Sequence, residues 1–294
     1  MKYLFQTKCP ITAIVLIAYA VTLLPGCNQQ SYNNPEGYDL ANPSKMQLGK
    51  VLNEISGLSF NTDNNTLLAI SDSKEKVFEL NIERRKLKDY TDRVVSAHSD
   101  LEDIVKVDST LYLLGSRGVI YEVPSRKHSD SSGTKAHPFS SNLKNDFETL
   151  YYDPGVNGLI MICKSCAFDE EAGVHSAFKF DLATKTFDTS AFYTLNDKEV
   201  HKVLKDDDAK FRPSAAAIHP INKRLYVLSS AGNLLIVTDI HGQVIEAYNL
   251  RPDDFPQAEG IAFAPNGDLF ISNEGKYGSM ATLLFFPYRT GNKK

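Results

Sequence analysis

Three glutamates recur along the chain at the same point of a repeated pattern. Glu102, Glu148 and Glu259 each begin a short run of strand-forming residues, and Ser56 and Ser214 begin two similar runs. The five positions are separated by 46, 46, 66 and 45 residues. A fold that brings them to one level makes a ring of three carboxylates and two hydroxyls. Carboxylates crowded in this way repel one another, so either some of them are protonated or a cation neutralises them.

A bound cation suits such a ring. Calcium takes about six to eight oxygen ligands in loose geometry, and carboxylates are among its preferred donors. Two residues that end second strand-like runs, Asp72 and Asn273, add oxygen donors nearby. The expected calcium ligands are therefore Glu102, Glu148, Glu259, Asp72 and Asn273, with Ser56 and Ser214 completing the channel ring. Two other interpretations stay open: a water-filled structural ring, and a pair of catalytic carboxylates.

Other chemistry has little support in the sequence. It contains no Gly-x-Ser-x-Gly, no His-Glu-x-x-His and no phosphate-binding glycine loop, and its seven histidines are scattered. There are 32 basic and 36 acidic residues, and two of the lysines lie before residue 27, so the chain from Cys27 onward carries a net charge near −6. A mildly acidic domain is a poor partner for nucleic acid, and none is expected.

The elements that must position the ring are five copies of one unit. Each copy has a short strand, a turn, and a second apolar strand; in the last copy these are 259–263, 265–268 and 269–273. A period near 45 residues with several short strands per unit is typical of a β-propeller, in which equivalent positions converge on a central channel. The sequence predicts an all-β, five-bladed propeller over residues 45–290.

Two irregularities mark the repeat. The last copy has room for only three strands, whereas residues 46–51 form a spare strand ahead of the first copy. We expect this N-terminal strand to complete the last blade, because such closure hides two sheet edges. The interval of 66 residues holds an insertion at about 189–211, with a short helix expected in 197–209. A sixth, degenerate blade inside the insertion is the alternative.

The N-terminus has the pattern of a bacterial lipoprotein signal. Lys2 and Lys8 precede an uncharged, mostly apolar run at 11–24, too short to cross a membrane as a helix. The sequence Leu24-Pro25-Gly26-Cys27 matches a lipobox, so we expect a signal peptide at 1–26 and lipidation at Cys27. Residues 27–44 then form the lipidated cysteine and a polar, flexible tether. Asn28 favours the outer over the inner membrane of the cell envelope.

Two cysteines remain in the mature chain, Cys163 and Cys166. Their spacing is that of a redox motif, but a thioredoxin-type site opens a helix, whereas this pair follows a strand-like run at 158–162. In an oxidising compartment a local disulfide can form. A structural or incidental role is therefore favoured over a redox-active one.

The segments around the five repeat positions resemble the SdiA-regulated (YjiK-like) family over about residues 45–287. The segments that carry the resemblance are 54–58, 100–104, 147–150, 212–214 and 256–263 with 272–275. The resemblance implies a five-bladed propeller, distantly related to NHL-type propellers, with a calcium site and no established activity. Asp103, Thr149 and Ala215 replace the glycine that usually follows the first residue of the motif.

Two functions from different classes follow. One is a calcium-binding propeller, tethered to the membrane through its lipid, that binds a small molecule or a protein at the channel mouth. The alternative is a metal-dependent hydrolase (an esterase, lactonase or phosphoesterase) that uses the carboxylates of the mouth. The hydrolase needs a general base beside an open metal position, and no histidine or extra acid is an evident candidate. The binding module is therefore preferred.

Cys27→Ser is expected to give an unlipidated protein, because the thiol of Cys27 is the group that takes the diacylglyceryl chain. The measurement is membrane fractionation together with metabolic labelling by palmitate. Labelling and membrane partition equal to those of the wild type would contradict the lipoprotein assignment.

Overall fold

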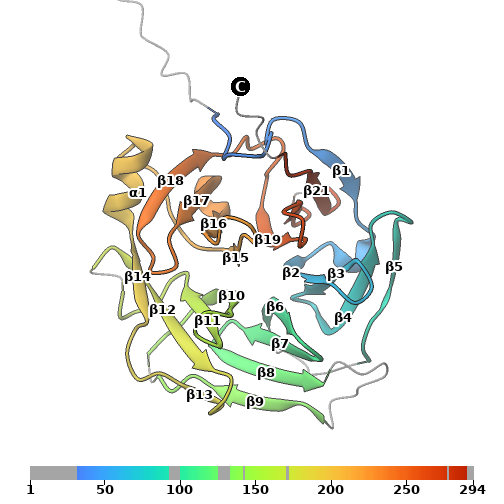
Figure 1. Cartoon of the computed structure of the whole chain (residues 1–294), viewed down its shortest axis with the longest axis horizontal. Helices are drawn as coiled ribbons and strands as arrows, with labels where there is room; N and C mark the ends of the chain where they lie inside the picture. Colours follow the sequence, from blue (N-terminus) through green and yellow to red (C-terminus); the bar gives the residue numbers. More distant parts are fainter. Residues whose placement is uncertain are drawn as a thin grey trace, which may run out of the picture. The chain divides into compact units, whose positions relative to one another are not determined.

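The computed structural model describes residues 32–92, 100–124, 133–141, 143–169, 172–276 and 278–289. They form five antiparallel sheets, arranged as the blades of a ring (Figure 1). The all-β, five-bladed propeller predicted from the repeats is confirmed. The expected signal peptide and the lipidation site Cys27 lie outside the described residues.

Each blade has an inner strand at the centre of the ring and further strands outside it (Figure 1). Blade 1 is β2 (Ile55–Asn61), β3 (Thr66–Ser71), β4 (Lys74–Asn81) and β5 (Lys86–Asp89). Blade 2 is β6 (Leu101–Val107), β7 (Thr110–Gly115), β8 (Val119–Pro124) and β9 (Lys135–Pro138). Blade 3 is β10 (Phe147–Asp153), β11 (Gly158–Cys163), β12 (Val174–Asp181) and β13 (Thr186–Phe187). Blade 4 is β15 (Ala215–Ile218), β16 (Leu225–Ser229), β17 (Leu234–Thr238) and β18 (Val244–Asn249).

Blade 5 closes the ring with strands from both ends of the chain. Its order is β19 (Ala258–Phe263), β20 (Leu269–Asn273), β21 (Thr282–Phe286) and β1 (Ser44–Gln47). The outermost strand β1 pairs with β21 from Ser44 opposite Phe285 to Gln47 opposite Thr282. The predicted closure by an N-terminal strand is therefore confirmed, and it pairs an edge of β21 that would otherwise be open.

The hydrophobic core lies between neighbouring blades. The second strands are almost continuously apolar, as at Leu67–Ile70, and they are buried on both faces. One cluster joins Leu58 and Phe78 of blade 1 to Phe270 and Leu283 of blade 5. Each blade thus buries its apolar faces against its neighbours, so the ring must close before the cores are complete.

The packed part of the chain begins before the expected boundary at residue 45. The Tyr38 and Leu40 side chains are buried, although both belong to the segment expected to be a tether. The Tyr38 hydroxyl donates a hydrogen bond of 2.6 Å to the Gly267 carbonyl, and its ring contacts His219 and Tyr288. Burial lowers the pKa of His219 to about 4, so the imidazole at the centre of this aromatic cluster is neutral. The large buried ring explains why this short segment is held on the propeller.

The long interval between the third and fourth repeats adds a strand and a helix to existing blades. The strand β14 (Tyr193–Asn196) pairs with β12 of blade 3, and α1 (Asp197–Leu204) contacts β18 of blade 4. The helix begins where the Asn196 side chain caps it and ends at Lys205 in the left-handed conformation. The insertion, in the described residues, thus does not make the sixth blade, and its helix is shorter than expected.

Cys163 and Cys166 form a local disulfide at the end of β11, with Cα atoms 6.0 Å apart. The disulfide that the sequence left open is therefore present. No helix formed by the described residues is long and apolar enough to cross a membrane.

Removal of residues up to 43 is expected to lower the melting temperature by at least about 5 °C, because the truncation deletes the buried Tyr38 side chain and its contacts. Removal through residue 48 also deletes β1, exposes the edge of β21, and should cause aggregation. Both are measured by calorimetry and light scattering on soluble protein that begins at residue 32 as the control. Equal melting temperatures for the three proteins would contradict this role of the N-terminal segment.

Candidate functional site

Four of the five repeat residues named from the sequence sit in β-bulges at the start of the inner strands, and the fifth, Ser214, directly precedes β15. The strand register shifts between Ile55 and Gly57, Leu101 and Asp103, Phe147 and Thr149, and Ala258 and Gly260. The residues in these bulges are Ser56, Glu102, Glu148 and Glu259. A bulge turns its extra residue out of the regular alternation of the strand, so it can direct a side chain toward the channel. Sequence reasoning missed the bulges, although it placed the residues that occupy them.

Two glycines show how closely the blades approach at these bulges. A Cβ at Gly57 would lie 2.7 Å from the backbone of Asp103 in the next blade, and one at Gly260 would lie 3.0 Å from the Leu58 side chain of blade 1. Contacts of a Cβ atom are very rarely so short. Glycine after the bulge residue therefore permits the contact between blades, whereas Asp103 uses its own side chain there.

The three glutamates act on one another electrostatically. Burial and then the neighbouring Glu148 raise the pKa of Glu102 to about 9. Burial and then Glu148 also raise the pKa of Glu259 to about 8. Burial raises the pKa of Glu148 itself, and a nearby lysine limits that rise. Acids separated by up to 157 positions in the chain are thus neighbours at one mouth of the channel. Their burial and mutual repulsion favour the protonated forms of Glu102 and Glu259.

Lys164 is a basic residue among these acids that sequence reasoning missed. Its ammonium group forms an ion pair with Glu148, and its charge also acts on Glu259. Burial by itself lowers the pKa of Lys164, but the Glu148 carboxylate raises it above its usual value. A signal was available, since Lys164 follows the second strand of its blade as Asp72 and Glu274 follow theirs.

Backbone hydrogen bonds confirm this second set of equivalent positions. The amides of Asp72, Ser116, Lys164 and Glu274 donate to the carbonyls of Glu54, Asp100, Asp146 and Gln257, at 2.9 to 3.1 Å. Each acceptor stands two residues before the bulge residue of its blade. These equivalent positions form a further layer of side chains around the mouth. Asp72 and Glu274 occupy two of the positions and Lys164 occupies another.

Asp72 and Asn273, the two additional candidate ligands, lie in different surroundings. Asp72 has an exposed surface, but the surrounding protein removes part of its hydration. This loss of hydration, followed by the charges of Glu54 and Glu274, raises the pKa of Asp72 to about 6. Asn273 is buried, and its amide nitrogen donates to the Asp254 carbonyl and the Thr282 hydroxyl. The Asn273 Oδ1 atom has no hydrogen-bond partner among the described residues.

Ser56 and Ser214 join neighbouring blades. The Ser56 hydroxyl donates to the Leu101 carbonyl, and the Ser214 hydroxyl donates to the Ala258 carbonyl, both at 2.8 Å. Asp103 does the same with a carboxylate, which accepts 2.8 Å bonds from the amides of Ile104 and Leu150. Burial raises the pKa of Asp103 well above its usual value. These residues hold the inner strands together around the mouth, since inner strands of adjacent blades form no ladder with one another.

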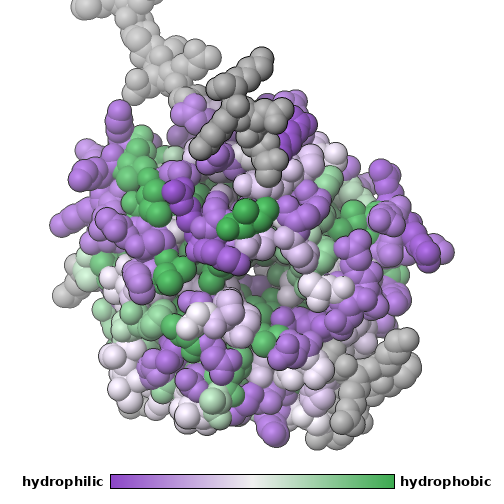
Figure 2. All heavy atoms as spheres, in the orientation of Figure 1, coloured by the Kyte–Doolittle hydropathy of each residue, from purple (hydrophilic) through white to green (hydrophobic). Residues whose placement is uncertain are grey.

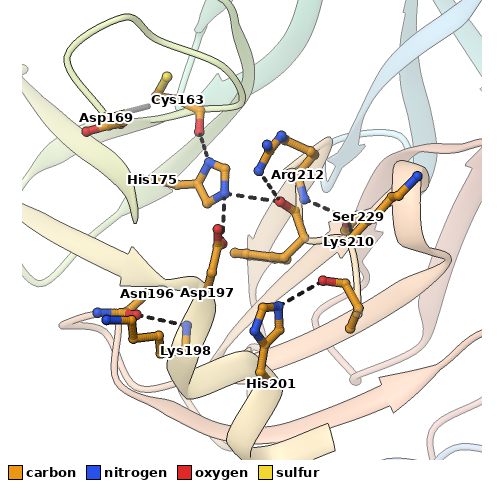
Figure 3. A network of polar contacts seen from close by, with 12 residues as sticks. Cys163, Asp169, His175, Asn196, Asp197, Lys198, His201, Lys210, Arg212 and Ser229 are labelled. Carbon is orange, nitrogen blue, oxygen red and sulfur yellow. Dashed lines mark hydrogen bonds and ion pairs between the residues drawn. The ribbon is translucent and has the colours of Figure 1, made fainter. Parts of the chain in front are cut away.

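A buried histidine ties the inserted segment to the mouth (Figure 3). His175 lies on β12, with Nδ1 3.0 Å from the Cys163 carbonyl and Nε2 3.1 Å from the Phe211 carbonyl. The Asp197 carboxylate is 3.2 Å from the same Nε2. The His175 ring therefore lies among three oxygen acceptors, two backbone carbonyls and one carboxylate. The contacts fix the backbone directly before Lys164 and ahead of Ser214.

The other end of the channel differs in chemistry. A cavity of about 320 Å³ is lined there by residues of all five inner strands or the turns that follow them, including Phe60, Tyr152 and Phe263. None of the described residues that line it is charged. The space-filling view is hollowed at the centre of the ring (Figure 2). The groups able to bind cations or transfer protons are therefore gathered at the acidic mouth, which Glu102, Glu148, Glu259 and Lys164 define.

The acidic mouth supplies the donors that calcium requires. Carboxylate oxygens are hard ligands, and Glu148 Oε2 is buried with no hydrogen-bond partner among the described residues. No three acidic, histidine or cysteine side chains of the described chain already surround one point at metal-binding distance. The donors fit the ion chemically, and binding would require the glutamate side chains to rotate toward it.

The fold is shared with solved structures of diverse activity. A luciferin-regenerating enzyme is 12% identical with a TM-score of 0.51, over 85% of this chain and 96% of that one. The PQQ-bound aldose sugar dehydrogenase of Streptomyces coelicolor is 11% identical with a TM-score of 0.51, over 85% and 99%. Regucalcin of Agrobacterium tumefaciens, a calcium-binding protein, is 12% identical with a TM-score of 0.50, over 86% and 95%. At such identities the likeness concerns the propeller fold alone.

No curated protein sequence matches this chain significantly. A family model does: the model of the SdiA-regulated proteins matches residues 34–277, which include all five repeat positions, Lys164 and the buried Tyr38. The expected resemblance is thereby confirmed, and the chain belongs to the SdiA-regulated family.

Proposed function

We propose that this protein is a lipid-anchored binding module of the bacterial cell envelope, whose acidic mouth holds a calcium ion and there binds a small molecule or a protein. The observation that carries the proposal is the convergence of Glu102, Glu148 and Glu259 on one mouth, where each acts on the charge of another. The anchor rests on the lipobox that ends at Cys27.

Electrostatics at the mouth supports a cation as the ligand. Without one, the raised pKa values of Glu102 and Glu259 keep both carboxyl groups largely protonated near pH 7. A divalent ion that replaces these protons gains two carboxylates in surroundings that screen charge poorly. Glu102, Glu148 and Glu259 would hold the ion, with Asn273 Oδ1 as a neutral donor. Bound calcium would supply positive charge to an anionic or carbonyl group of a ligand. The propeller fold of regucalcin, a calcium-binding protein, is compatible with this at the level of the fold.

Calcium is expected to raise the melting temperature of chelator-treated protein, because only the folded chain assembles the ligands. Glu259→Gln should weaken this response, since the variant keeps the shape of the side chain and removes one charge. The matched control is Glu122→Gln, which alters a glutamate paired with His137 and Lys185 away from the mouth. An unchanged wild-type melt on adding calcium, with no metal in the purified protein, would contradict the proposal.

The calcium response should grow with pH. Glu102 and Glu259 have folded-state pKa values of about 9 and about 8, above the ordinary value of 4.5. In chelator their contribution to stability is full below about pH 4.5 and is lost as the pH rises through 8 to 9. Calcium offsets that loss, so the difference in melting temperature between calcium and chelator should be larger at about pH 9 than at about pH 6. A difference that shrinks with pH would contradict the ligand assignment.

A hydrolase remains the second candidate because two carboxyl groups of the mouth have different electrostatic surroundings. Burial and the neighbouring Glu148 raise the pKa of Glu102 to about 9, whereas pairing with Lys164 limits the rise in the pKa of Glu148. Carboxyl groups whose environments separate their pKa values are the usual parts of acid–base catalysis. A panel of esters, lactones and phosphoesters tested with calcium should show no turnover if the protein is a binding module. Turnover lost in Glu102→Gln and kept in Glu122→Gln would favour the hydrolase.

A further inference from the structure

Lys164 neutralises Glu148 at the acidic mouth, and backbone hydrogen bonds hold it in place. Its amide donates 2.9 Å to the Asp146 carbonyl, and the Ser165 amide donates to the same oxygen. The disulfide from Cys163 to Cys166 encloses these two residues, and His175 holds the Cys163 carbonyl from the other side. The start of the side chain is therefore fixed, and its position relative to Glu148 is built into the fold.

The side chain itself has freedom that its backbone lacks. About a quarter of the Lys164 side chain is exposed, 26%, against 13% for that of Glu148. Its ammonium group reaches one oxygen of Glu148, while the second oxygen of that carboxylate has no partner among the described residues. A four-carbon stem can turn toward solvent by rotation about single bonds, so release of the ion pair requires no movement of the blade.

The two cations compete for the same carboxylate, because the Lys164 ammonium group is already paired with Glu148. A divalent ion bound by Glu148 and Glu259 would stand beside the ammonium group that acts on these same two residues. At such distances the two cations repel each other, because the surroundings are less polar than water. The lysine is the one that can give way, since its partly exposed side chain has an alternative position in water.

We propose that Lys164 is a tethered counter-ion of the acidic mouth, paired with Glu148 in the ion-free protein and displaced from it by the incoming divalent cation. The displacement rests on the calcium site proposed above. It makes Lys164 the residue that sets the affinity of the site, since each binding event must first break its ion pair. The same lysine holds the mouth together when no ion is bound.

The test compares calcium titrations by calorimetry for the wild type, Lys164→Gln, Lys164→Arg and Lys88→Gln. Lys164→Gln removes the competing charge, so the calcium affinity should increase by about tenfold. Lys164→Arg retains the charge and should stay near the wild-type affinity. Lys88→Gln is the matched control, because Lys88 is paired at 2.7 Å with another buried glutamate, Glu79, between β4 and β5. In chelator, Lys164→Gln should melt below the wild type because it leaves Glu148 without its partner.

The outcomes separate the two proposals. Equal calcium affinities for the wild type and Lys164→Gln would overturn the displacement and leave the calcium site standing. Absence of calcium binding in every protein would overturn the calcium site and the displacement with it. A tighter affinity in Lys88→Gln as well would show a general effect of net charge and would overturn the specific role of Lys164.

A measurement on the unmodified chain covers the case in which Lys164→Gln does not fold. Brief acetylation by an amine-reactive ester, followed by mass spectrometry, reports the reactivity of each lysine. Lys164 should react several-fold faster in calcium than in chelator, because displacement frees its amine from the Glu148 pair. Lys88 should react equally in both. A Lys164 reactivity that calcium leaves unchanged or lowers would contradict the displacement.

Discussion

Five inner strands meet at one channel, and the narrow space between their backbones limits which side chains fit at the acidic mouth. Neighbouring blades approach so closely that a Cβ atom at Gly57 would lie 2.7 Å from the backbone of Asp103. Bulges relieve the crowding by turning one residue of a strand out of the regular alternation, and glutamates occupy three of these positions. The inner strands form no ladder with one another, so side-chain bonds from Ser56, Asp103 and Ser214 join them instead.

This geometry makes the mouth electrostatically costly, and the chain offsets the cost in two ways. The pKa values of Glu102 and Glu259 rise because burial and the charge of Glu148 disfavour further ionisation. Glu148 itself is paired with Lys164, which stands where two other blades carry Asp72 and Glu274. A lysine at a position where two other blades carry acids thus gives the mouth an internal cation. The mouth can release the protons of Glu102 and Glu259 and the ammonium group of Lys164. Such a site is suited to bind an external cation reversibly.

The blade that carries Lys164 is also the most modified one. Blade 3 has the extra strand β14, the disulfide at the end of β11, and the His175 contacts that reach α1 and the segment before blade 4. The insertion therefore supports the mouth from the outside of the ring instead of adding a blade. Because the insertion lies beside Lys164, the least regular part of the propeller is next to the acidic mouth.

The sequence by itself determined the number of blades, the closure by the N-terminal strand and the equivalence of the three glutamates. Each of these follows from periodicity, because one repeat is one blade and equal positions must reach equal depth in the ring. The structure alone decided that Ser56 and Ser214 bind neighbouring carbonyls, that Tyr38 packs beneath His219, and that Lys164 pairs with Glu148. These contacts join residues 16 to 181 positions apart, and they depend on where bulges and turns direct single side chains. Periodicity fixes the depth of a residue in the ring but not the direction of its side chain. The repeat therefore predicted the ring of acids, but it did not predict that the Lys164 side chain turns toward Glu148.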